Sequence, residues 1–133
     1  MRLSEQTMQA IERFQTRIGQ APAIEVMWLF GSRANGTESS DSDYDLAVAL
    51  TFDAEFDHIR FAEDFAFELA QMTDKPVSVV DINRVPVPLA ANIVNEGQVV
   101  YCSSDLRLRA EEQRVWSLWE AFKHAHEQQQ QAI

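Results

Sequence analysis

The sequence predicts an α/β fold in which a sheet of about four strands carries helices packed mainly on one face. Three observations lead to this prediction. Short apolar runs alternate along the chain with longer segments whose apolar residues recur every three or four positions. Gly and Pro residues separate many of these segments. The chain has 133 residues, 46% of them hydrophobic, which is enough for a domain with a buried core.

Four apolar runs are the predicted strands, and they lie at about residues 24–30, 43–50, 77–82 and 98–102. The third run, Val77-Ser78-Val79-Val80-Asp81-Ile82, is rich in the β-branched residues that favour extended backbone. Strands and helices therefore alternate, which is typical of an α/β sheet.

Four longer segments are the predicted helices, and they lie at about residues 4–18, 53–72, 89–95 and 104–127. Ser4 and Asp53 are expected to cap the first two helices by accepting hydrogen bonds from free amides. The last helix is the longest, and we expect its glutamine-rich continuation, residues 128–133, to be frayed. At this length, residues 1–133 are expected to form a single domain.

The charge of the chain excludes some classes of partner. There are 21 acidic and 11 basic residues, for a formal net charge of −10. This balance argues against direct binding of nucleic acid through a broad phosphate-neutralising surface. The single cysteine, Cys102, permits no disulfide within the chain, and we see neither a signal peptide nor a membrane span. We therefore expect a cytoplasmic protein without a membrane partner.

The chain is organised around the stretch that joins the first two predicted strands. It begins with Gly31-Ser32, continues for ten residues and ends in Asp43-Tyr44-Asp45. Side chains two positions apart on a strand point to the same face. Asp43 and Asp45 should therefore project together, with Tyr44 on the opposite face.

This pattern suggests two binding sites next to each other. Two carboxylates held this close repel each other unless a proton or a cation lies between them, and Mg²⁺ commonly takes one or two carboxylates. Gly31 lets the backbone approach a ligand closely, and the amides after it can bind an anion. Asp43 and Asp45 are thus a candidate metal site beside a candidate phosphate site. From spacing alone, a solvated turn remains the alternative.

The combination of Gly31-Ser32, ten residues and Asp43-Tyr44-Asp45 resembles the signature of the nucleotidyltransferase superfamily of DNA polymerase β. The short chain is most similar to the minimal nucleotidyltransferases (MNT), which occur as antitoxins beside HEPN-domain toxins. The resemblance implies the polymerase-β-like fold, with a mixed sheet and a long C-terminal helix.

The resemblance also implies a third acidic residue. Asp81 ends the third predicted strand, and its position alone leaves open whether it is a ligand or an exposed strand end. Relatives carry a third acid on a later strand beside the Asp-x-Asp pair. The resemblance therefore implies that Asp43, Asp45 and Asp81 form the catalytic set and hold two Mg²⁺ ions.

ATP binding is assigned by the same resemblance to Gly31, Ser32 and Arg33. Many relatives have Gly-Ser-x-Ala-Arg-Gly in this loop, and here Asn35 stands in place of the arginine. One charge for phosphate is therefore missing. Arg33 is expected to compensate for it; otherwise the affinity for nucleotide is lower.

The function implied is that of an antitoxin enzyme, a Mg²⁺-dependent protein adenylyltransferase. It would transfer AMP from ATP to a hydroxyl, expected to be that of a tyrosine, on a HEPN ribonuclease toxin. Two alternatives stay open: a small-molecule nucleotidyltransferase of the aminoglycoside type, and a non-catalytic antitoxin that acts by binding alone. Trp116, Trp119 and Phe122 give the last helix excess aromatic surface, which favours a protein partner and a hetero-oligomer with the toxin.

Overall fold

A computed structural model of the chain describes residues 3–52 and 57–131. Helices and strands alternate along it as the sequence predicts. In chain order the elements are α1 (Glu5–Ile18), β1 (Ile24–Phe30), α2 (Ser32–Asn35), β2 (Tyr44–Leu50), α3 (His58–Thr73), β3 (Val77–Asp81), α4 (Val87–Glu96), β4 (Gln98–Cys102) and α5 (Asp105–Gln131).

The strands form one mixed sheet in the order β3-β2-β1-β4. β1 is antiparallel to both β2 and β4, whereas β2 and β3 are parallel. The predicted four-stranded mixed sheet is therefore confirmed, and the β2–β3 pair becomes important for the site described below.

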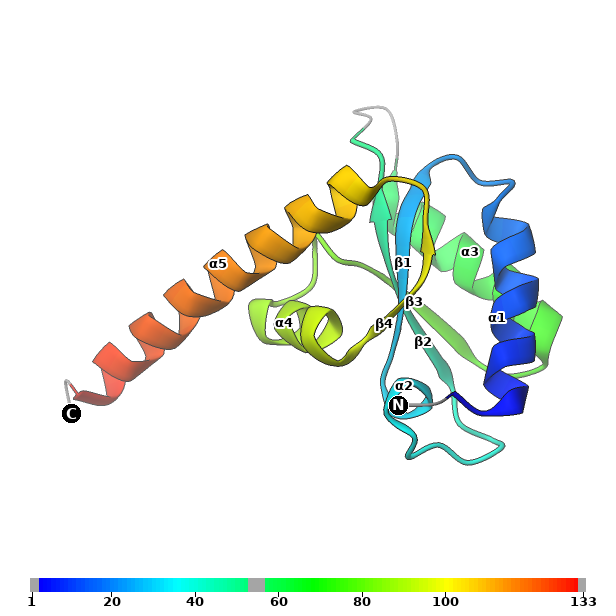
Figure 1. Cartoon of the computed structure of the whole chain (residues 1–133), viewed down its shortest axis with the longest axis horizontal. Coiled ribbons are helices and arrows are strands. Elements are labelled where there is room, and N and C mark those ends of the chain that lie inside the picture. Colours follow the sequence, from blue (N-terminus) through cyan, green and yellow to red (C-terminus); the bar gives the residue numbers. More distant parts are fainter. Residues whose placement is uncertain (1–2, 53–56, 132–133) are drawn as a thin grey trace.

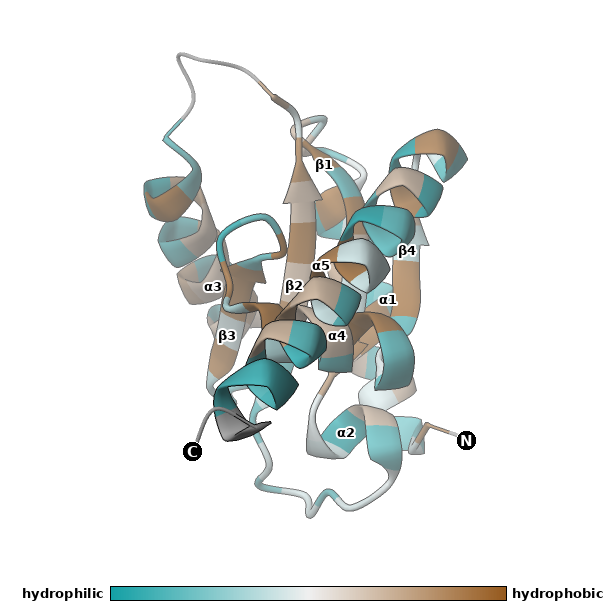
Figure 2. Cartoon of the chain, turned by 90° about the vertical axis from the view of Figure 1, so that its left-hand side faces the viewer, coloured by the Kyte–Doolittle hydropathy of each residue, from teal (hydrophilic) through white to brown (hydrophobic). Residues whose placement is uncertain are grey.

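The helices cover both faces of the sheet, so the expectation that they pack mainly on one face is wrong. Figure 1 shows α1 and α3 on one side of the sheet and α4 and α5 on the other. The residues of β1 and β2 that join the core on the α1–α3 side include Met27, Leu29, Leu46 and Val48. Those that join the core on the α4–α5 side are Val26, Trp28, Ala47 and Ala49. In Figure 2 the ribbon of β2 is coloured mainly as hydrophobic. Because β1 and β2 carry apolar side chains on both faces, both faces have to be covered.

The ends of the elements follow the predictions closely, with two differences. Asp57 caps α3 by accepting a hydrogen bond from the Arg60 amide at 3.0 Å, whereas the expected cap, Asp53, lies outside the described residues. α5 continues to Gln131 instead of fraying after residue 127. The glutamines that suggested a frayed tail are good helix formers, and no Gly or Pro interrupts the segment.

A buried polar network fixes the start of α5 to the sheet. The Arg107 guanidinium donates to Glu111 Oε1 at 2.9 Å, to Glu25 Oε1 at 2.9 Å and to the Leu50 carbonyl at 2.7 Å. It also donates to Asn83 Oδ1 at 2.8 Å. Arg107 and Glu111 are both buried. These bonds join α5 to β1, to the end of β2 and to the turn after β3.

The far half of α5 projects away from the domain (Figure 1). Val115 is buried against α4 and the sheet, but the side chains of residues 120–129 are all exposed. Within residues 3–52 and 57–131, no helix is both long and apolar enough to cross a membrane.

Candidate functional site

The turn between β1 and α2 brings backbone against a carboxylate. Gly31 has a φ of +75°, a backbone conformation that residues other than glycine rarely adopt. A Cβ added at Gly31 would overlap the Asp45 carboxylate. The main chain of the Gly31-Ser32 turn therefore lies directly beside Asp45. Glycine is required here both for the backbone angle and for the close approach.

Tyr44 and Asp45 point to opposite faces of the sheet, as the sequence predicts. Tyr44 is buried on the α1–α3 side, where its ring meets Phe14 edge to face with the ring centres 5.6 Å apart. Asp45 points to the other face, level with Phe30 of β1, and is half-buried. Asp43 comes just before the strand and is exposed.

The electrostatics of the pair favour a cation. Burial raises the pKa of the Asp45 carboxyl above its ordinary value, and the nearby charge of Asp43 raises it further. A positive ion between the two groups would relieve both effects. Two carboxylates open to solvent on one side also suit Mg²⁺, which keeps positions for water and phosphate oxygens. Asp43 and Asp45 therefore fit one such ion.

The structure does not bring Asp81 to this pair. In the parallel register of β2 and β3, Asp45 lies opposite Ser78, whereas Asp81 lies opposite Val48. Asp81 is thus three residues, or about 10 Å, farther along the strand. Val48 belongs to the α1–α3 side, so Asp81 also faces the other side of the sheet. Among the described residues, no group of three His, Cys, Asp or Glu side chains is placed to hold a metal.

Asp81 instead holds the turn that follows β3. It is 6% exposed, and its Oδ1 accepts a hydrogen bond from the Asn83 amide at 2.9 Å. Its Oδ2 lies 3.5 Å from His58 Nδ1 and 3.5 Å from Arg84 Nε. The carboxylate that the resemblance assigned to catalysis therefore joins the start of α3 to the β3–α4 turn.

Arg33 does not reach the open side of the loop as the resemblance implied. Its side chain is 1% exposed, and its guanidinium lies 4.1 Å from the centre of the Tyr44 ring. It donates to the carbonyls of Ser42 at 3.0 Å and Ser40 at 3.2 Å, and to Thr7 Oγ1 at 3.0 Å. Arg33 therefore ties the loop before the Asp-x-Asp segment to α1, and it is not available to replace the charge missing at Asn35.

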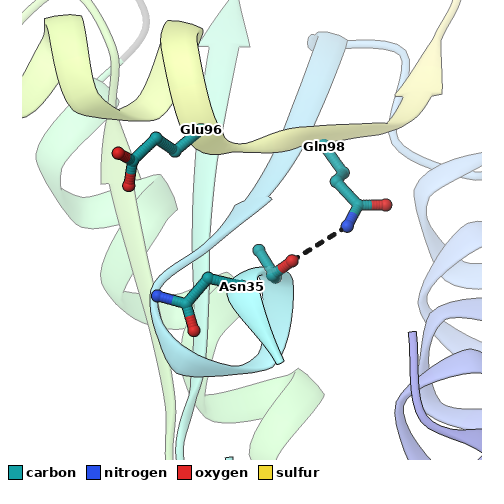
Figure 3. Close-up of a pocket in the computed structure, with 4 residues that line it drawn as sticks. Asn35, Glu96 and Gln98 are labelled. Carbon is teal, nitrogen blue, oxygen red and sulfur yellow. Dashed lines mark hydrogen bonds between the residues drawn. The ribbon is translucent and has the colours of Figure 1, made fainter. Parts of the chain in front are cut away.

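A cavity of about 620 Å³ opens beside α2, and it is lined by Ala34, Asn35, Glu96 and Gln98 (Figure 3). Gln98 Nε2 donates to the Ala34 carbonyl at 3.0 Å, which links the start of β4 to α2. Asn35 Oδ1 accepts from the Thr37 amide at 3.1 Å and from its hydroxyl at 2.6 Å. Sequence reasoning missed Glu96 and Gln98, because no local pattern indicates that the end of α4 lies beside this loop.

Comparisons with known proteins find chains of similar sequence and similar fold. The chain matches the family described as polymerase beta, nucleotidyltransferase, over residues 12–106. It is 34% identical over 80 residues to the protein adenylyltransferase MntA of Shewanella oneidensis, an alignment that covers 60% of this chain. The alignment covers 55% of MntA, so the chain matches about half the length of this relative.

Solved structures share the fold over nearly the whole chain. One is a toxin–antitoxin crystal structure with AMP-PNP, with a TM-score of 0.71, 23% identity and 94% of each chain covered. Another is the tri-AMPylated Shewanella oneidensis HEPN toxin in complex with MNT antitoxin, with a TM-score of 0.70, 20% identity and 92% of each chain covered.

Proposed function

The chain belongs to the polymerase beta nucleotidyltransferase family, and we propose that it transfers AMP from ATP to a hydroxyl group of a HEPN ribonuclease toxin, and so neutralises the toxin. The observation that carries the proposal is the contact between the Gly31-Ser32 turn and Asp45, with Asp43 beside it. One turn thus offers backbone amides for phosphate next to carboxylates that fit a cation. The relative MntA is named as a protein adenylyltransferase, which supports a protein as the acceptor.

We place the triphosphate of ATP at the Gly31-Ser32 turn. The nucleoside would occupy the neighbouring cavity, which offers polar groups from Asn35 and Glu96 (Figure 3). Glu96 is an acceptor for amino or hydroxyl groups and would repel phosphate, so its charge favours this orientation over the reverse. Gln98 acts indirectly, because its amide holds the Ala34 carbonyl and thereby the shape of α2.

Asp43 and Asp45 are the residues that would hold Mg²⁺. The ion, when bound, would neutralise the triphosphate and the departing pyrophosphate. In the transfer, the acceptor oxygen forms a bond to the α-phosphorus while the bond from that phosphorus to the bridging oxygen of pyrophosphate breaks. Asp81 is about 10 Å along the sheet and on its other face, so the hydroxyl proton leaves to solvent on the exposed Asp43 side.

A tyrosine near the ribonuclease site of the toxin is the proposed acceptor. AMP attached there would add bulk and negative charge, both of which exclude RNA. The net charge of −10 suits a partner whose RNA-binding surface is basic. The aromatic surface of α5, formed by Trp116, Trp119 and Phe122, is the proposed docking surface, since Trp116 is 40% and Phe122 42% exposed.

A second candidate function is neutralisation by binding alone, with the nucleotide as a bound ligand. The separation of Asp81 from the Asp43–Asp45 pair favours it, because the site then has two acids instead of three. Both functions predict a complex with a toxin, but only the first predicts a change in the toxin's mass.

The test is to mix the chain, the product of the neighbouring gene, ATP and Mg²⁺, and to weigh that product by intact-mass spectrometry. Transfer predicts a mass gain equal to one or more adenylates, lost in Asp45→Asn. Asp41→Asn is the matched control, because Asp41 lies in the same loop but pairs with Lys75 at 3.1 Å. Neutralisation by Asp45→Asn at equal potency, with no mass gain for either protein, would leave binding alone as the function.

A further inference from the structure

We infer that Ser78 occupies the third ligand position of the carboxylate site, so that this chain holds one divalent cation with its nucleotide where a three-acid site would hold two. The inference rests on the proposed nucleotidyltransferase function and names the residue at which this chain departs from the three-acid arrangement.

The register of β2 and β3 supports this assignment. Ser78 lies directly opposite Asp45, and paired residues on neighbouring strands point to the same face. The neighbours of Ser78 agree with this direction. Val77 and Val79 pack on the α1–α3 side, whereas Val80, two residues after Ser78, packs on the α4–α5 side. The Ser78 side chain is exposed, and adjacent strands are about 4.8 Å apart, so Ser78 projects from the same face as Asp45 on the neighbouring strand.

No other described acid takes this place. Asp81 faces the opposite side of the sheet, and Asp41 forms an ion pair with Lys75. Within the described ranges, no cluster of three potential metal-binding side chains exists. The ligand set at this corner of the sheet is therefore Asp43, Asp45 and a neutral hydroxyl.

The chemistry of serine determines the consequence. A serine hydroxyl is a weak ligand for Mg²⁺ and brings no charge, so the site carries two negative charges instead of three. One ion shared with the triphosphate suits two carboxylates, but a second ion would meet a site with too little negative charge. We therefore expect nucleotide binding to be retained and activation of the acceptor hydroxyl to be slow.

The experiment is a calorimetric titration of Mn²⁺ into the full chain in the presence of AMP-PNP. The unchanged chain should bind one ion, whereas Ser78→Asp should bind two. The added charge should also tighten the first ion at least about tenfold, because a unit charge about 4 Å away acts strongly at a protein surface. Ser78→Asn is the matched control, with the shape of aspartate and no charge, and should behave as the unchanged chain does.

Three results would overturn the inference. The first is two ions bound by the unchanged chain, and the second is identical titrations for Ser78→Asp and Ser78→Asn. The third is loss of Mn²⁺ binding in Asp81→Asn while its circular dichroism shows an intact fold. A thermal scan without metal gives a second readout, since Ser78→Asp should melt lower than Ser78→Asn and recover when Mn²⁺ is added.

These results can be separated from the fate of the proposed function. If Ser78→Asp gains a second ion but neither protein modifies the toxin, Ser78 is the third position and the proposed transfer is wrong. If the unchanged chain modifies the toxin rapidly and already binds two ions, the transfer stands and the inference about Ser78 is wrong.

Discussion

Replacing Arg33 by methionine separates a structural from a phosphate-binding role for this residue. The sequence places Arg33 directly after Gly31-Ser32, where a cation for phosphate is expected, but the structure buries it against Tyr44 and the loop carbonyls. We expect Arg33→Met to lower the stability of the fold and to leave the affinity for Mg-ATP nearly unchanged at temperatures where the variant is folded.

The size of the effect follows from what the guanidinium contacts. Its partners on Gln6 and Ser40 belong to exposed residues, and water will replace the donor there. The acceptors on Thr7 and Ser42 are buried or half-buried, and removing the donor costs about 1–3 kcal/mol each. Loss of the contact with the Tyr44 ring adds about 0.5–2 kcal/mol. Part of this cost is offset because methionine, unlike arginine, brings no charge that has to leave water on folding. The expected net loss in the free energy of unfolding is about 2–4 kcal/mol.

Urea denaturation followed by circular dichroism measures the first effect, and calorimetric titration of Mg-ATP at low temperature measures the second. The free energy of unfolding of a domain is about 5–15 kcal/mol, so the variant should remain folded, with its Tm lowered by about 5–15 °C. Arg60→Met is the matched control, because the Arg60 side chain is 80% exposed. A Kd raised about tenfold or more, together with a stability equal to that of Arg60→Met, would refute the structural role.

Three further predictions concern single groups of the site and of the α5 anchor. Asp45→Asn should stabilise the metal-free protein at pH 7, because folding raises the pKa of Asp45 and so makes its charged form unfavourable. This gain in the free energy of unfolding should vanish as the pH falls below the ordinary aspartate pKa of about 4. Urea denaturation at pH 7 and below pH 4 measures the difference. Gly31→Ala should cost about 1–2 kcal/mol for its left-handed backbone, and it should abolish Mn²⁺ binding because the new methyl group displaces the Asp45 carboxylate; Gly19→Ala, at a negative φ, is the control. Glu111→Gln should cost about 1–3 kcal/mol at pH 7, since it removes one of the two carboxylates that pair with the buried Arg107 and leaves Glu25 as the other. Although burial raises the pKa of Glu111, hydrogen bonds from Asn83, Arg114 and Arg107 lower it overall. The stabilisation by the Glu111 carboxylate should therefore be present at neutral pH and disappear in acid. A free energy of unfolding that does not change with pH below pH 5 would contradict this reasoning.

Local features of the chain were predictable from the sequence. The alternation of apolar residues placed β1 and β4 at the residues where the structure has them, and the direction of Tyr44 followed from the two-residue period of a strand. Ser4 caps α1 as expected, since its hydroxyl accepts from the Thr7 amide at 3.1 Å. These features depend on neighbours within a few residues of one another.

The structure separates Asp81 and Arg33 from the open side of the Gly31–Asp45 turn, and both positions depend on contacts between distant segments. Asp81 ends an apolar strand and matches the later-strand acid that the resemblance implies, but the register of β2 against β3 decides which residue lies level with Asp45. No local pattern in the sequence reveals this register. The burial of Arg33 has the same origin, because the groups that surround it come from α1 and from the far side of the loop.

The anchoring of α5 at one end makes the helix a lever. From Glu111 to Gln131 the helix runs for about 30 Å, so a tilt of about 10° at the anchor would move its far end by about 5 Å. Arg107 and Glu111 would thus determine where the hydroxyl of a protein docked on the aromatic surface of α5 lies relative to the phosphate, although neither residue contacts that protein. A misplacement of about 1 Å can slow a reaction about a hundredfold. Weakening the Arg107–Glu111 anchor would therefore reduce modification of the partner without reducing its binding, although the nucleotide site and the docking residues stay unchanged.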